Sequence, residues 1–113
     1  MQLPTPEPPV SSALSEIAPK LAELSEHVLF GDIWERPGLS KRDRSLITIA
    51  ALTVLYRTDQ LRGHIARGLD NGLSQDEIIE AITQMAFYGG WPTAVNAARA
   101  AAQVFAERRT TQG

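Results

Sequence analysis

The stretch from residue 46 to residue 52 constrains the fold most, because it is apolar at nearly every position. A helix that begins near Ser40 and runs to about Tyr56 contains this stretch. Such a helix is apolar almost all round, which requires burial on several sides. A buried parallel strand is the competing interpretation, but the length of the run and its alanines favour a helix. The stretch reads Leu46-Ile47-Thr48-Ile49-Ala50-Ala51-Leu52.

Helical periodicity and helix-end signals recur along the rest of the chain. Ser40 is a good N-cap, Thr58 can cap the next helix, and Ser74 with Glu77 forms a capping box. Asn71-Gly72 and Gly89-Gly90 end helices, and Pro92 suits a first turn. No segment alternates as a strand would. These signals predict an all-α protein with helices over about 15–30, 40–56, 58–71, 75–88 and 92–108.

The expected helices carry apolar faces, among them the first and the last helix. In the first, Ile17, Leu21, Leu24 and Val28 repeat every three to four residues. In the last, the expected face is Val95, Ala98, Ala101, Ala102 and Phe105. Its many alanines allow close helix packing, either inside the chain or against another subunit.

The chain of 113 residues is expected to form one domain. Residues 1–12 are interpreted as a flexible proline-rich tail, 13–109 as a single helical domain, and 110–113 as a disordered tail. The N-terminal segment has no signal-peptide pattern, and no apolar run is long enough to span a bilayer. A cytoplasmic protein with no membrane partner is therefore expected.

Composition excludes several function classes. The net charge is −2 with both signs mixed, so no nucleic-acid partner is expected. The chain has no cysteine, which excludes disulfides, thiolate nucleophiles and zinc–thiolate sites. Only two histidines are present and no metal-binding spacing includes them, so no metal site is expected.

The main candidate for chemistry is His64. Its neighbours three to four residues away include Gln60, Arg67 and Gly68, and Arg57 lies one further turn back. An imidazole beside an amide and two guanidinium groups could bind an anion and move a proton. A solvated polar helix face is the alternative.

A second cluster consists of Tyr88 and Trp91 on either side of Gly89-Gly90. Glycines between aromatic residues allow backbone or ligand to approach closely. Aromatic residues at a helix junction also serve as core or interface anchors, which is the alternative here.

Taken together, these segments resemble the carboxymuconolactone decarboxylase family, over about residues 28–107. Four segments match those of the family in their order and spacing. They are Leu39-Ser40-Lys41-Arg42-Asp43-Arg44-Ser45-Leu46-Ile47-Thr48-Ile49-Ala50, then Gln60-Leu61 with His64, then Asn71-Gly72-Leu73-Ser74-Gln75-Asp76-Glu77-Ile78-Ile79-Glu80, and Ala86-Phe87-Tyr88-Gly89-Gly90-Trp91-Pro92 with the alanine-rich helix.

The resemblance implies a compact alkylhydroperoxidase D-like fold of five to six helices, and a cofactor-free enzyme. The implied reaction is decarboxylation of 4-carboxymuconolactone, or a related small lactone or oxo acid, in aromatic catabolism. His64 would be the catalytic proton carrier. Arg57, Gln60, Tyr88 and Trp91 would bind the substrate, and the site would lie near subunit contacts of a homotrimer or homohexamer.

The same resemblance sets limits on the chemistry. Related alkylhydroperoxidase D-like proteins have a CxxC pair that falls here on Arg57 and Gln60, and a common glutamate falls on Ser45. Thiol-dependent peroxide reduction is therefore not expected, since it needs a thiolate. Two alternatives stay open: isomerisation or hydration of another small oxo compound, and a non-catalytic oligomeric binding protein.

Overall fold

The computed structural model describes residues 10–112, and most of the expected N-terminal tail lies outside the described residues, as does Gly113. The described part is all-α and contains no strand, as predicted. Contacts divide the chain into two units, Met1–Gly38 and Leu39–Gly113. The sequence predicts one domain over 13–109. Its helix signals give no indication of the boundary between the two units near Gly38.

The N-terminal unit consists of short helical segments. Its elements are α1 (Val10–Ile17), α2 (Pro19–Leu24), a π-helical turn (Ser25–Phe30) and a 3-10 turn (Ile33–Glu35). A single helix over 15–30 was expected, but Pro19 interrupts it. Proline has no N–H and restricts the residue before it, and Ala18 accordingly adopts φ −144° and ψ 69°.

This unit does not bury its own apolar face. Trp34 is its buried large residue, and the Trp34 ring packs against Phe30 with centroids 5.7 Å apart. Leu21, Leu24 and Val28 of the predicted apolar stripe instead face a hollow of about 490 Å³. The fourth residue of the stripe, Ile17, is 82% exposed. The hollow is lined by Leu14, Leu21, Leu24, Ser25, Val28, Leu29 and Ile33.

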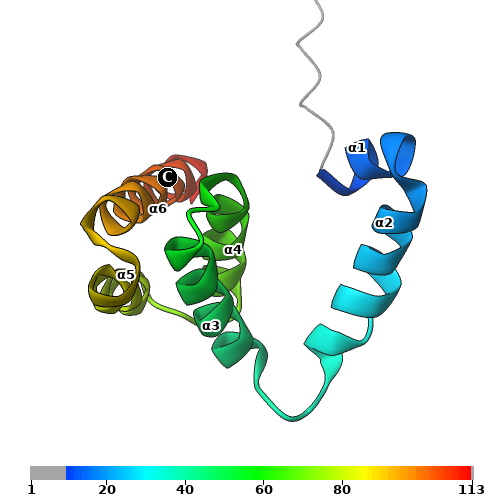
Figure 1. The fold of residues 1–113 in the computed structure, drawn as a ribbon, viewed down its shortest axis with the longest axis horizontal. Coiled ribbons are helices and arrows are strands. Elements are labelled where there is room, and N and C mark those ends of the chain that lie inside the picture. Colours follow the sequence, from blue (N-terminus) through cyan, green and yellow to red (C-terminus); the bar gives the residue numbers. More distant parts are fainter. Residues whose placement is uncertain (1–9, 113) are drawn as a thin grey trace, which may run out of the picture. The chain divides into compact units, whose positions relative to one another are not determined.

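The C-terminal unit contains the other four helices (Figure 1). They are α3 (Lys41–Val54), α4 (Thr58–Asp70), α5 (Gln75–Gly89) and α6 (Trp91–Gln112). Helix α3 packs against all three others, and Ile49 at its centre is fully buried. Only one stripe of the helix is buried, however: Ser45, Ile49 and Thr53. Ile47 is 56% exposed, so the expected burial on several sides is not reached in the single chain. The core contains Ile49, Leu61, Ile65, Leu73, Ile78, Ile82, Ala94, Ala97, Ala100, Ala101, Val104 and Phe105.

The expected caps are present at three helix ends. The Ser40 hydroxyl accepts a hydrogen bond from the Asp43 N–H (3.0 Å), and both hydrogen bonds of the Ser74–Glu77 capping box form. Gly72 has φ +107° where α4 ends. At the start of α4 the prediction is wrong: Arg57, not Thr58, is the N-cap residue, and its side chain makes no cap hydrogen bond.

Two glycines allow neighbouring helices to approach closely. A Cβ at Gly68 would lie 3.0 Å from Ile49 Cδ1, and a Cβ at Gly89 would lie 3.1 Å from Val54 Cα. The space that Gly89 provides between Tyr88 and Trp91 is therefore filled by the backbone of α3.

The buried face of α6 differs from the expected one. Ala101 and Phe105 are buried as predicted, but Ala98 and Ala102 are exposed. In a helix this rich in alanine, one small side chain differs little from the next, so hydrophobic periodicity does not fix which side faces the core. The helix also continues to Gln112, into the segment expected to be a disordered tail.

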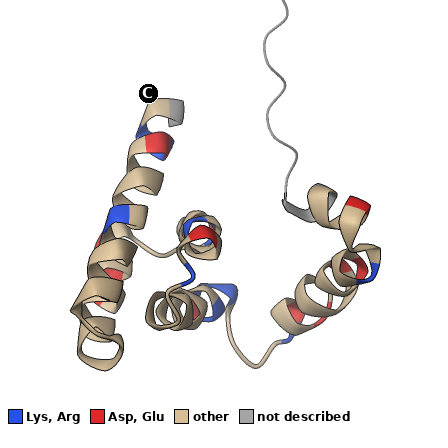
Figure 2. Cartoon of the chain, turned by 45° about the horizontal axis from the view of Figure 1, so that its top comes forward, with Lys and Arg blue, Asp and Glu red and all other residues tan. Residues whose placement is uncertain are grey.

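Charged residues of both signs are scattered along the helices (Figure 2). No helix in residues 10–112 is both long and apolar enough to cross a membrane. Several large apolar side chains of the C-terminal unit nevertheless face solvent. They include Ile47 (56% exposed), Phe87 (82%), Tyr88 (73%) and Trp91 (70%).

Candidate active site

Helix α4 places His64 on the side that faces α3. The Asn71 side-chain amide donates to Ser45 Oγ at 2.9 Å, and Gly68 packs against Ile49 and Ser45. His64 is four residues before Gly68, so it lies one turn away on the same side of α4. Because α3 and α4 are antiparallel, this turn of α4 lies beside the next turn of α3. We call this region, between α3 and the His64 side of α4, the α3–α4 seam.

The environment of His64 lowers its pKa below the ordinary value of 6.5. Burial of the imidazole is the larger cause, since it disfavours the charged form, and the positive charge of Arg67 adds to it. At neutral pH the ring is mainly neutral and can take up a proton when an anion lies nearby.

Arg57 and Gln60 precede His64 on α4 and are both exposed. Gln60 is four residues before His64, which is about one helical turn. Arg57 is seven residues before His64, which is about two turns. Arg57 is about 10 Å from His64 along the axis. Its guanidinium donates to the Leu55 carbonyl at 3.3 Å, at the C-terminal end of α3. Gln60 therefore lies one turn from His64, and Arg57 lies where α3 ends and α4 begins.

Tyr88 and Trp91 lie at the corner between α5 and α6. Trp91 lines a hollow of about 170 Å³ between these two helices, and His64 does not line it. The corner is at the same end of the unit as Arg57, because Gly89 approaches Val54 at the end of α3. The described chain thus brings the aromatic residues toward Arg57 but does not close them over His64.

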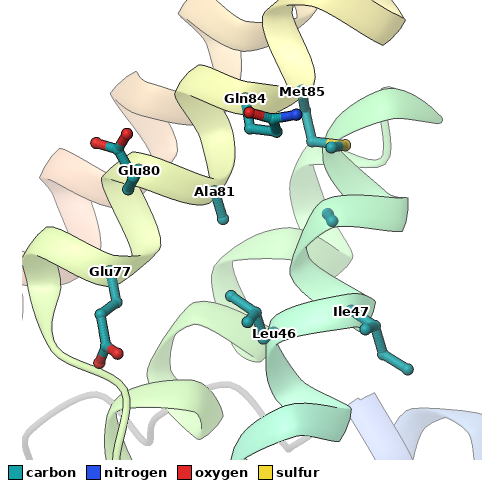
Figure 3. Close-up of a pocket in the computed structure, with 8 residues that line it drawn as sticks. Leu46, Ile47, Glu77, Glu80, Ala81, Gln84 and Met85 are labelled. Atoms are coloured by element: carbon teal, nitrogen blue, oxygen red, sulfur yellow. The ribbon is translucent and has the colours of Figure 1, made fainter.

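A larger groove, of about 400 Å³, runs along the other side of α3, against α5. In Figure 3, Leu46 and Met85 extend into it from opposite helices, while Glu80 points away. Glu77 at its edge accepts a hydrogen bond from the Ser74 N–H and binds Arg42, and the Ser74 bond is the main reason that its pKa is lowered. None of the predicted site residues lines this groove.

Three residues near the seam were given no role from the sequence: Tyr56, Asn96 and Arg67. Tyr56 has φ +61° between α3 and α4, and its hydroxyl accepts a hydrogen bond from the Asn96 amide on α6. No sequence signal indicates this, because glycine is the residue expected in that conformation. Arg67 was recognised as a neighbour of His64 only, since its effect on the pKa of His64 depends on how deeply the imidazole is buried.

The acidic residues and histidines do not gather into a metal-binding cluster anywhere in residues 10–112. The chemistry that the seam offers is therefore that of its side chains: a proton on an imidazole, an amide, and guanidinium groups that attract anions.

Residues 19–103 match the model of the carboxymuconolactone decarboxylase family. The chain belongs to this family, and its fold is the expected all-α, alkylhydroperoxidase D-like one.

Two relatives have names that describe a reaction. The 4-carboxymuconolactone decarboxylase of Acinetobacter baylyi is 42% identical over 76 residues, which is 67% of this chain and 57% of that protein. The nitrosuccinic acid decarboxylase of Metarhizium robertsii is 33% identical over 75 residues, 66% of this chain and 52% of that protein. This chain thus spans little more than half the length of either decarboxylase.

A third relative covers more of the chain. An uncharacterized 15.0 kDa protein of Paracoccus denitrificans is 34% identical over 97 residues, 84% of this chain and 72% of its own length.

Replacing Arg67 with Gln should raise the pKa of His64, because a positive charge that opposes protonation is removed. The pKa should stay below 6.5, since burial is the larger cause of the shift. An NMR titration of the His64 imidazole measures both. Arg99→Gln on α6 is the matched control and should leave this pKa unchanged. An unchanged His64 pKa in the Arg67 variant would show that the two groups do not interact.

Proposed function

We propose that this protein is a cofactor-free decarboxylase acting on 4-carboxymuconolactone or a related small lactone or oxo acid. The observation that carries the proposal is the half-buried His64 on α4, one turn after Gln60 and about two turns after Arg57, the N-cap residue of the same helix. Membership of the family and the names of two relatives support the choice of reaction.

In the proposed reaction, Arg57 holds a substrate carboxylate where α3 ends and α4 begins. The bond between the lactone ring and a second carboxylate breaks, CO₂ leaves, and the electron pair moves into the conjugated lactone carbonyl. The resulting enolate carbon then takes one proton. No redox partner is needed, because the substrate accepts its own electrons.

His64 supplies that proton. Its lowered pKa keeps the imidazole mostly neutral in the free protein at pH 7. A bound anionic substrate favours the imidazolium, which then lies within the site as a general acid. Gln60, one turn away, is placed to donate a hydrogen bond to the oxygen on which negative charge develops.

The exposed aromatic corner completes the proposal. Tyr88 and Trp91 are more than two-thirds exposed in a single chain. Few side chains of their size are exposed to this extent. We propose that a homo-oligomer, a trimer or hexamer, covers them, and that they form part of the wall of a site near a subunit contact.

Replacing His64 with Ala should lower the turnover number for CO₂ release by about a hundredfold, the usual scale for a general acid. The Michaelis constant should change much less, because Arg57 still binds the carboxylate. Ser15→Ala in the N-terminal unit is a control that should keep full activity. A folded His64→Ala variant with the wild-type rate would exclude the proton-carrier role.

The oligomer can be tested without a substrate. Light scattering coupled to size exclusion should give a mass of three or six chains at micromolar concentration. Trp91→Glu should weaken the assembly, because a carboxylate in an apolar contact is not solvated; Arg99→Glu on α6 is its matched control. A wild-type mass of one chain would contradict the proposed assembly.

A further inference from the structure

Helices α3 and α4 end in the same hydrogen-bonded turn, the Schellman motif. At the end of α4, the N–H groups of Gly72 and Leu73 donate to the carbonyls of Leu69 and Gly68. At the end of α3, the N–H groups of Tyr56 and Arg57 donate in the same way, to Thr53 (3.2 Å) and Leu52 (3.0 Å). The two turns differ in the residue at the left-handed position, which is Gly72 in one and Tyr56 in the other.

The left-handed position strains any residue with a side chain, and glycine is its usual occupant. Tyr56 is the one non-glycine residue with positive φ in the described part of the chain. A tyrosine there is less favourable for the backbone than a glycine, so its side chain must provide something that glycine does not. The structure shows what that is: the phenol hydroxyl accepts a hydrogen bond from the Asn96 amide of α6.

This hydrogen bond ties the α3–α4 turn to α6, a helix that packs against both α3 and α4. Arg57 is the next residue, and its guanidinium donates back across Tyr56 to the Leu55 carbonyl. The direction of the guanidinium therefore depends on the conformation of Tyr56. One of its nitrogens is engaged by Leu55, which leaves other N–H groups of the fork to bind an anion.

We propose that Tyr56 is a positioning residue, held by Asn96, that fixes Arg57 for binding the substrate carboxylate. The proposal rests on the proposed function, because it takes Arg57 as the residue that binds the carboxylate. A purely structural role, in which Tyr56 only fastens α6 to the turn, is the alternative that the experiment must separate.

Two substitutions at Tyr56 separate backbone strain from the hydrogen bond. Tyr56→Phe keeps the strain and loses the hydroxyl, whereas Tyr56→Gly loses both. The Gly variant should therefore melt at a higher temperature than the Phe variant. Asn96→Ala removes the same hydrogen bond from the other side. Gln103→Ala is the matched control, since it removes a different hydrogen bond to α6, the 2.8 Å bond from Arg62 of α4.

The positioning role predicts that the Michaelis constant follows the hydroxyl while the melting temperature follows the strain. Tyr56→Gly, Tyr56→Phe and Asn96→Ala should each raise the Michaelis constant for 4-carboxymuconolactone by about fivefold or more, with the turnover number changed less than about twofold. Gln103→Ala should leave both constants unchanged. A Tyr56→Gly variant with the wild-type Michaelis constant would overturn the positioning role.

A measurement without turnover keeps this test apart from that of the proposed function. If the wild type releases no CO₂ from the lactone, the proposed function fails, and amide hydrogen exchange then tests the premise of the positioning role, that the bond to Asn96 holds the turn before Arg57. The amides of Tyr56 and Arg57, which bond to Thr53 and Leu52, should exchange faster in Tyr56→Phe and Asn96→Ala than in the wild type or Gln103→Ala. Unchanged exchange at these two amides would overturn it.

Discussion

The packing of α3 against the three other helices of its unit is the constraint on which the site depends. Ile49 at its centre is fully buried. Gly68 and Gly89 lack the side chains that would hold α4 and α5 away from α3. His64 lies on α4, one turn before Gly68, and its imidazole is half-buried. This burial is the larger cause of its lowered pKa.

Much of the fold could be predicted because helix ends carry local signals. Ser40, Ser74 and Gly72 act within one turn of the chain, so the sequence predicts them correctly. The prediction fails where the signal is weak or is overridden. Pro19 divides a helix whose apolar periodicity continues past it, and the alanines of α6 do not distinguish the core face from the exposed one.

The candidate site could be predicted only in part. Helical spacing correctly places Gln60 one turn from His64, because spacing is a property of a single helix. The pKa of His64 depends on how far the folded unit buries its imidazole, and the hydroxyl of Tyr56 bonds to Asn96 of α6. Neither tertiary contact leaves a pattern in the sequence. The joining of Tyr88 and Trp91 to the site also stays a prediction, since these residues are exposed in the single chain.

The central claim is that a half-buried histidine with a lowered pKa delivers the proton in decarboxylation. The pH dependence of kcat/KM for CO₂ release from 4-carboxymuconolactone tests it most directly. Because the acid must be protonated, kcat/KM should fall as pH rises through the pKa of His64 in the free protein, and the midpoint should lie below 6.5. The same limb should be absent from the residual activity of His64→Gln. A rate that rises with pH over this range, or a limb that persists in the variant, would contradict the account.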